Sequence, residues 1–214
     1  MKPGAGFFLT VEGVDGAGKS TQARRLAARL RETGRAVTLT REPGGAPGAE
    51  EIRALLLTGD PARWSPVTEA LLFFAARRDH VERTILPALA RGEVVISDRF
   101  TDSTRAYQAA ARPGGMAGAP PALIDLLHRE AIGLDPDLTL VFDMDPEAAL
   151  SRGLARETDE ARFERLGPGF QTRLRESFRA IAAAEPGRCL MVDAGGGEAE
   201  VEARVWAAVS ARLT

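Results

Sequence analysis

The apolar residues of the chain fall into five short, nearly continuous runs, and each run predicts a β-strand. Continuous apolar runs are typical of strands in a parallel sheet, because helices cover both faces of such a sheet. The runs span residues 7–12, 36–40, 94–97, 138–143 and 189–193.

Helical patterns fill the segments between the predicted strands. Apolar residues recur at steps of three and four after residue 20, and at steps of four near the end of the chain. These positions are Ala23, Leu26, Ala27 and Leu30 in the first pattern, and Val201, Val205, Val209 and Leu213 in the second. A further helical run is expected over 122–131, after a loop at 112–121. Alternation of strands and helices predicts an α/β fold, in which ligands usually bind beyond the carboxyl ends of the strands.

The composition is that of one globular domain. The chain has 214 residues, of which 44% are hydrophobic and 27% charged, and this length is short for two domains. The net charge of -2 supplies no overall field that would attract nucleic acid or an anionic membrane, so small-molecule partners are expected. No apolar stretch is long enough to span a membrane, the N-terminus does not resemble a signal peptide, and Cys189 is the single cysteine. We therefore expect a cytoplasmic protein without disulfides.

A glycine-rich segment after the first predicted strand carries the strongest chemical signal. Residues 13–20, GVDGAGKS, match the phosphate-binding loop (P-loop) pattern G-x-x-x-x-G-K-[ST], with a strand before the loop and a helix after it. The glycines let backbone N–H groups surround phosphate oxygens, and the Lys19 ammonium can reach the β- and γ-phosphates. The residues expected to bind ATP are Gly13, Val14, Asp15, Gly16, Ala17, Gly18, Lys19, Ser20 and Thr21.

The predicted strand at 94–97 ends in a carboxylate, Asp98. In P-loop enzymes an acidic residue at such a strand end acts near Mg²⁺, together with the hydroxyl of the P-loop serine. We therefore expect Ser20 and Asp98 to ligate Mg²⁺. The pattern predicts a P-loop NTPase-type three-layer α/β/α fold with a five-stranded parallel sheet, in a single domain over 1–214. A charged stretch at about 152–169 is expected to form a lid.

Four further segments accompany the P-loop in an order that one enzyme family shares. The five segments are 12–22 (EGVDGAGKSTQ), 40–45 (TREPGG), 72–78 (LFFAARR), 98–108 (DRFTDSTRAYQ) and 136–140 (PDLTL). On these segments the chain resembles the bacterial thymidylate kinases, from about residue 7 to the final helix. The resemblance implies transfer of the γ-phosphoryl group of Mg·ATP to dTMP, giving dTDP for dTTP biosynthesis, by a homodimer.

The resemblance also implies how the nucleoside of dTMP is bound. The residues that match the family's motifs place Asp15 on the sugar 3′-hydroxyl, Phe74 against the thymine ring and Arg78 on a thymine carbonyl. Phe74 and Arg78 are four residues apart and so share a helix face, whereas the neighbouring Arg77 is expected to be solvated. In the TREPGG segment, the bond between Glu42 and Pro43 is a candidate for the cis form, because X–Pro is its only common setting.

Other matching residues are implied to surround the acceptor phosphate and base. Arg99 is implied to bind the acceptor phosphate, since a planar two-pronged donor suits a phosphate, and Arg41 is a weaker candidate for the same region. Thr104 and Gln108 match residues that contact the base. The Tyr107 ring is implied to occupy the space of a 2′-hydroxyl, which selects deoxyribose.

Arginines of the expected lid complete the implied catalytic set. Some family members carry a catalytic arginine inside the P-loop, where this chain has Gly16, and members that lack it use lid arginines. The resemblance therefore implies that Arg152 or Arg156 clamps the transferring phosphoryl oxygens, alongside Lys19 and Arg99. The family's usual DRFE sequence is ARFE at 161–164 here, which argues against an acidic role at position 161.

Three other functions are compatible with a P-loop. The nearest is a kinase of another nucleoside monophosphate or of a deoxynucleoside. A regulatory GTPase is disfavoured because no Asn-Lys-x-Asp segment occurs and no switch glycine follows Asp98. A nucleotide-binding module without catalysis would bind ATP and transfer no phosphoryl group.

Overall fold

The sheet at the centre of the molecule has five parallel strands in the order β2-β3-β1-β4-β5. The structure is a computed structural model, and it describes residues 6–60, 63–112, 115–154 and 166–213. The five predicted strands are confirmed to within one residue at each end. They are β1 (Phe7–Gly13), β2 (Val37–Arg41), β3 (Val94–Asp98), β4 (Leu138–Asp143) and β5 (Cys189–Asp193).

Helices connect the strands, as the periodicity predicted. The helical run expected over 122–131 is present as α6, which continues directly into the π-helical turn η3. The helices in chain order are α1 (Lys19–Glu32), α2 (Pro47–Leu57), α3 (Pro66–His80), η1 (Val81–Ile85), α4 (Leu86–Ala90), α5 (Thr101–Tyr107), α6 (Pro121–Leu127), η3 (His128–Ile132), α7 (Pro146–Leu154), α8 (Pro168–Ala184) and α9 (Glu198–Ser210). Among the described residues, no helix is long and apolar enough to cross a membrane.

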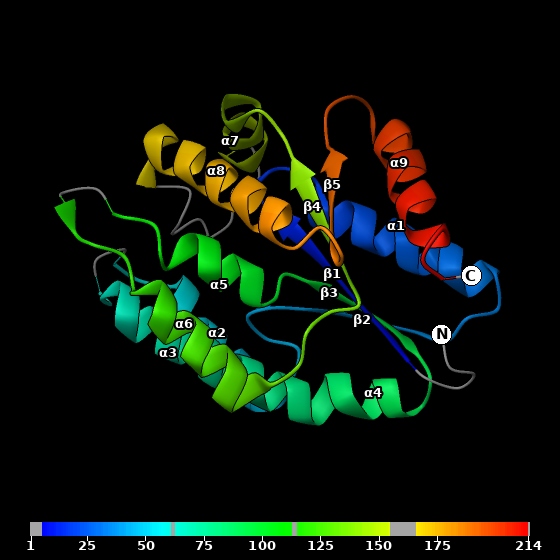
Figure 1. The fold of residues 1–214 in the computed structure, drawn as a ribbon, viewed down its shortest axis with the longest axis horizontal. Helices are drawn as coiled ribbons and strands as arrows, with labels where there is room; N and C mark the ends of the chain where they lie inside the picture. Colours follow the sequence, from blue (N-terminus) through cyan, green and yellow to red (C-terminus); the bar gives the residue numbers. More distant parts are fainter. Residues whose placement is uncertain (1–5, 61–62, 113–114, 155–165, 214) are drawn as a thin grey trace.

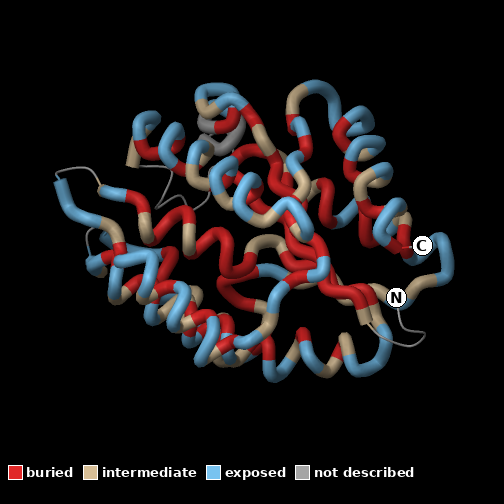
Figure 2. Tube along the Cα trace, in the orientation of Figure 1, coloured by how far each residue is buried: buried red, intermediate tan, exposed pale blue. Residues whose placement is uncertain are grey.

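The elements form three layers, with the sheet between two layers of helices. Helices α1 and α9 cover one face, and α4, α5 and α8 cover the other, with α3 and α6 packed outside them (Figure 1). The apolar positions that predicted α1 and α9 are all buried in the largest core cluster. The three central strands β1, β3 and β4 are almost continuously buried (Figure 2), which explains why their sequences are apolar without alternation. The edge strands β2 and β5 are partly exposed.

The strand order creates a crevice at the carboxyl ends of the central strands, where a ligand can bind. Strand β1 lies between β3 and β4, so the chain leaves β1 at the point where the strand order reverses direction. In parallel α/β sheets this crevice beyond the carboxyl ends is the usual ligand site. Gly13, Asp98 and Asp143 end the three central strands there.

The expected lid falls partly outside the described residues. Residues 152–154 complete α7, and 168–169 begin α8. Residues 155–165, between them, lie outside the described part of the chain. The bond between Glu42 and Pro43 is cis, as the sequence suggested.

Candidate functional site

The P-loop turns sharply from β1 into α1. Gly13 has φ 129°, and a Cβ atom there would lie 2.4 Å from the carbonyl oxygen of Phe142, so the position accepts glycine only. Gly18 has φ 86° immediately before the first residue of α1. The N–H groups at the start of α1 therefore face the loop, an arrangement that suits bound phosphate.

Lys19 is buried over the P-loop. Its Nζ atom donates to the carbonyl oxygen of Val14 at 2.7 Å, and the residue is 6% exposed. Burial, and then the nearby charge of Arg99, lower the pKa of Lys19 to about 8, although the charges of Asp15 and Asp98 oppose the shift. At neutral pH Lys19 is therefore mainly protonated, and its ammonium group lies beside the P-loop backbone.

The two predicted Mg²⁺ ligands lie side by side. The Ser20 hydroxyl donates to Oδ2 of Asp98, which ends β3 beside the P-loop. Mg²⁺ is usually held by one or two protein oxygens together with substrate phosphates and water. A hydroxyl and a carboxylate at this point are hard oxygen donors and fit that ion.

Arg99 is the centre of a charged cluster beside the P-loop. Its Nη2 atom donates to Oδ1 of Asp15, as an ion pair, and to the Tyr107 hydroxyl at 3.0 Å. The Tyr107 hydroxyl in turn donates to Oδ2 of Asp15 at 2.7 Å. Burial acts against ionisation of Asp15, but the charges of Arg99 and Lys19 lower its pKa overall. Three of the predicted acceptor residues are therefore in direct contact with one another.

A cavity of about 180 Å³ brings the charged residues together. It is lined by the P-loop and by the ends of β2 and β3, and the residues that line it are Asp15, Gly16, Gly18, Lys19, Ser20, Arg41, Glu42, Arg53, Asp98 and Arg99. Arg41 reaches this cavity as predicted, although it also pairs with Glu50 at 3.1 Å. Arg53 and Glu42 were not identified from the sequence.

A second polar cluster lies between α3 and α5. Arg77 is 2% exposed; its Nε atom donates to Glu42 at 2.7 Å and its Nη2 atom donates to Thr104 at 3.1 Å. Within the described part of the chain, Nη1 of Arg77 has no hydrogen-bond partner. Gln108, the other predicted base contact, is buried and donates to Glu69 at 3.2 Å.

The structure disagrees with the predicted surroundings of two consecutive arginines. Arg77, expected to be solvated, is buried. Arg78, expected to face the base, has a half-exposed side chain that pairs with Glu82 and donates to the carbonyl oxygen of Ala131 at 2.9 Å. Phe74 is 3% exposed and packs in a hydrophobic cluster rather than lining an open site. The helix face that meets α5 carries Arg77, one residue earlier than the sequence analysis placed it.

Phe73 precedes Arg77 by one helical turn and so shares a face with it, although the guanidinium of Arg77 itself lies 4.9 Å from the centre of the Phe74 ring. Phe73 is partly exposed at the edge of the largest core cluster, four residues before Arg77. The sequence FFAARR contains two aromatic–arginine pairs with this spacing, so spacing alone could not decide between them.

A cavity on the other side of the P-loop was also missed by the sequence analysis. It has a volume of about 300 Å³ and lies between the start of α1 and the loop before α9. Small residues line much of it, including Gly18, Gly196 and Gly197. Gln22 lines it too; this side chain is 3% exposed and donates to the carbonyl oxygen of Glu198 at 2.9 Å.

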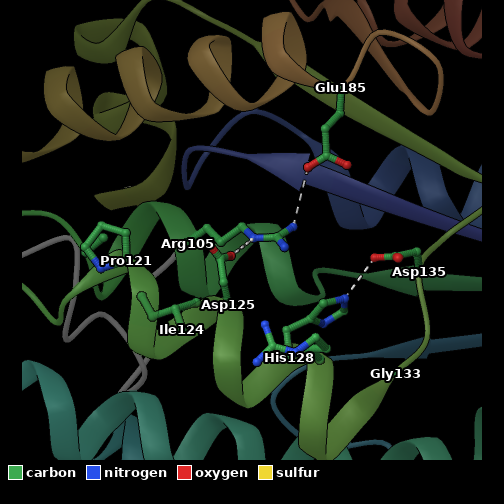
Figure 3. A pocket seen from close by; sticks show the side chains of 10 residues that line it. Arg105, Pro121, Ile124, Asp125, His128, Gly133, Asp135 and Glu185 are labelled. Carbon is green, nitrogen blue, oxygen red and sulfur yellow. Dashed lines mark hydrogen bonds and ion pairs between the residues drawn. The ribbon is translucent and has the colours of Figure 1, made fainter.

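A further cavity lies away from these residues. It has a volume of about 600 Å³ and is formed by α5, α6, η3 and the segments that precede β4 and β5. Figure 3 shows its charged side chains paired with one another: Arg105 with Asp125 and Glu185, and His128 with Asp135. None of the predicted site residues lines it.

The two predicted lid arginines cannot be placed against the cluster. Arg152 belongs to α7, but its side chain is not among those described, and Arg156 lies outside the described residues. The assignment of either residue stays a prediction.

Comparisons with known proteins agree on one family. The family model for thymidylate kinase matches residues 11–205. A thymidylate kinase of Dinoroseobacter shibae is 60% identical over 200 residues, covering 94% of each chain. One of Caulobacter vibrioides is 55% identical over 206 residues, covering 96% of this chain and 94% of its own. The crystal structure of thymidylate kinase from Ehrlichia chaffeensis superposes with a TM-score of 0.74 at 33% identity, covering 96% of this chain and 99% of that one.

Proposed function

Because the chain belongs to the thymidylate kinase family, we propose that it transfers the γ-phosphoryl group of ATP to dTMP and releases dTDP and ADP. The main observation behind the proposal is that Lys19, Ser20, Asp15 and Arg99 all line the same cavity. Groups suited to a triphosphate and groups suited to a monophosphate nucleotide line the same space. Donor and acceptor phosphates can therefore meet there.

The P-loop side of this cavity is the donor site. Backbone N–H groups of residues 13–18 and the Lys19 ammonium bind the β- and γ-phosphates. Ser20 and Asp98 would hold Mg²⁺, which would neutralise phosphate charge. The cavity of about 300 Å³ beside Gly197 receives the adenine ring, because its small residues leave room for a flat base.

The Arg99 cluster is the acceptor-phosphate and sugar site. Arg99 and Arg41 line the cavity and bind the phosphate of dTMP. Asp15 accepts from the 3′-hydroxyl, since its lowered pKa keeps the carboxylate ionised. Tyr107, held by its hydroxyl against Asp15, excludes a 2′-hydroxyl.

Arg77 replaces Arg78 in the proposed base site. A buried guanidinium N–H without a partner is unfavourable unless a ligand supplies an acceptor, and a thymine carbonyl is such an acceptor. Phe73 is on the same helix face and provides a ring against which the base can stack. Thr104 and Gln108, on the facing helix and just beyond it, complete the site.

Positioning and charge neutralisation account for the chemistry. The phosphate oxygen of dTMP is ionised near neutral pH, so it attacks the γ-phosphorus in line without a general base. Lys19 and Arg99 both line the cavity and neutralise charge on the reacting groups. Arg152 or Arg156, in the lid predicted at about 152–169 of the single domain, is proposed to complete the clamp.

A panel of acceptors tests the proposed substrate. Purified protein with Mg·ATP is incubated with dTMP, dUMP, dCMP, AMP or thymidine, and the diphosphate or monophosphate products are separated chromatographically. We expect dTMP to be phosphorylated with the highest kcat/KM, and dUMP at a modestly lower value because one methyl group discriminates weakly. Preference for AMP, or for thymidine over dTMP, would assign the chain to another nucleotide or nucleoside kinase.

The biological setting is proposed from the same family membership. We propose a cytoplasmic homodimer that works in dTTP biosynthesis. Exposed apolar side chains on neighbouring helices, Val67 and Leu71 on α3 and Leu126 on α6, offer a surface for a second copy. Light scattering during gel filtration tests the assembly: a monomer mass at micromolar concentration would exclude it.

A further inference from the structure

Glu12 carries a carboxylate that the proposed chemistry does not use. It is the second-last residue of β1 and is fully buried, with 0% of its surface exposed. Its Oε1 atom accepts from the backbone N–H of Phe100 at 2.7 Å, and its Oε2 atom accepts from the Ser103 hydroxyl. Burial, and then the charge of Asp102, raise the pKa of Glu12 to about 7. A buried carboxylate is unfavourable, so the two donors that Glu12 accepts from indicate a specific structural task.

The first of these hydrogen bonds supports an unusual backbone conformation at Arg99. Among the residues that the structure describes, Arg99 is the one non-glycine residue with positive φ, at 73°. Such a conformation persists only where the surroundings hold it. Three hydrogen bonds do so: Arg99 N–H donates to Val11 O at 3.0 Å, Ser97 Oγ donates to Arg99 O at 2.8 Å, and Glu12 accepts from the next N–H.

The second hydrogen bond reaches the guanidinium of the same residue. Nη1 of Arg99 donates to Oγ of Ser103 at 2.8 Å and to the carbonyl oxygen of Gly13 at 3.1 Å. Because the Ser103 hydroxyl donates its hydrogen bond to Glu12, the lone pairs of the Ser103 oxygen are free to accept from Arg99. The chain of contacts runs from Glu12 through Ser103 to Nη1, while Nη2 holds Asp15 and Tyr107.

We propose that Glu12 is a positioning residue for Arg99, holding its strained backbone directly and its guanidinium through Ser103. The inference rests on the proposed role of Arg99 as the ligand of the acceptor phosphate. Glu12 touches neither substrate. It fixes where the two nitrogens of Arg99 point, and so it sets the affinity for the monophosphate acceptor. Its effect on ATP is much smaller, because the charge of Glu12 is only a minor contribution to the pKa of Lys19.

The test compares E12Q with a matched buried substitution on the same strand. E12Q keeps the shape and one oxygen for the Phe100 N–H, but it presents an amide donor to Ser103. The control is Thr10→Val, two residues earlier on the same face of β1. Thr10 is 0% exposed and its hydroxyl contacts Thr139 at 2.8 Å, away from Arg99. Both variants lose one buried polar contact.

Steady-state kinetics at pH 7.5 give the readout, because this value lies above the pKa of Glu12, about 7, and below that of Lys19, about 8. We expect E12Q to raise the KM for dTMP by about tenfold or more, because hydrogen bonds to charged groups contribute at least that much. The KM for ATP should stay within about twofold, and Thr10→Val should leave both KM values unchanged. Ser103→Ala should raise the dTMP KM as well. The double variant, E12Q with Ser103→Ala, should have a dTMP KM no higher than that of the more impaired single variant, since both substitutions interrupt the same chain of contacts.

The outcomes separate this inference from the proposed function. Equal shifts of both KM values in E12Q, or the same shifts in Thr10→Val, would overturn the positioning role in favour of general structural damage. An unchanged dTMP KM in folded E12Q, while Arg99→Ala raises it strongly, would also overturn it and leave the proposed function intact. If wild-type protein does not phosphorylate dTMP, the proposed function fails first.

Discussion

Replacing Arg77 and Arg78 by lysine, one at a time, tests which of the two side chains binds the base of dTMP. Arg77 is buried, bonds to Glu42 and Thr104, and has an Nη1 atom without a partner in the described part of the chain. Arg77→Lys keeps the positive charge beside Glu42 but loses the planar fork that reaches Thr104 and the base together. Arg78→Lys is the matched control, because Arg78 is exposed and pairs with Glu82 on its own helix.

The expected loss follows from the hydrogen bonds involved. A hydrogen bond with a charged partner contributes about 1.5–3 kcal/mol, which corresponds to roughly 10- to 150-fold in kcat/KM. We expect Arg77→Lys to lower kcat/KM for dTMP by that factor while the KM for ATP changes little. The lost contact with Thr104 should also cost about 1–2 kcal/mol of stability, or roughly 2–8 °C in Tm for a domain of this size. Arg78→Lys should stay within about twofold, since exposed pairs contribute little.

The assay measures initial rates of ADP formation at varied dTMP, with circular dichroism to follow thermal unfolding. ATP is kept saturating, so that the initial rates report on the use of dTMP alone. The reasoning fails if Arg78→Lys impairs dTMP use as strongly as Arg77→Lys does, or if Arg77→Lys retains the wild-type kcat/KM.

Four further predictions follow from the same contacts. The pKa of Lys19 is lowered to about 8, so kcat/KM for ATP should fall as pH rises through that value, and a rate profile flat to pH 9.5 would contradict the assignment. Loss of a lid arginine that clamps the phosphoryl group should lower turnover by roughly 10³–10⁵, so Arg152→Ala and Arg156→Ala cannot both retain full turnover in stopped assays. Glu12 has a folded pKa of about 7 against an ordinary value of 4.5. Between these pH values the folded state binds a proton that the unfolded state has lost, so the folded state loses stability as pH rises through them. The Tm of E12Q minus the Tm of wild type should therefore increase from pH 5 to pH 8, and a constant difference would refute the shift. Tyr107→Ala should raise the activity with 5-methyluridine monophosphate relative to dTMP, measured as a ratio of kcat/KM values, whereas an unchanged ratio would show that another group excludes the 2′-hydroxyl.

The sequence predicted the strands and the P-loop because both depend on local pattern. Five apolar runs bounded by helical periodicity correspond to β1–β5 within one residue, and the P-loop motif itself specifies the turn at Gly13. Asp98 could be located because it ends a predicted strand, whereas Arg99 and Tyr107 were assigned from the resemblance of residues 98–108 to the thymidylate kinases.

The parts that the sequence could not decide depend on contacts between distant segments. Arg77 and Arg78 are equivalent in local sequence, and the packing of α3 against the rest of the fold buries the first and leaves the second half-exposed. Glu12 shows no signal beyond its place before the P-loop, because its partners lie some ninety residues away. The cavity beside Gly197 forms only where the loop before α9 returns to α1.

A single-turnover reaction with [γ-³²P]ATP, Mg²⁺ and excess dTMP tests the central claim most directly, because it follows the phosphoryl group itself. If donor and acceptor phosphates meet in the cavity between Lys19 and Arg99, the label should pass from ATP to dTDP in one exponential phase, with no labelled protein after acid quenching at any time. Label trapped on the protein, or released as inorganic phosphate faster than dTDP forms, would contradict direct transfer in that cavity.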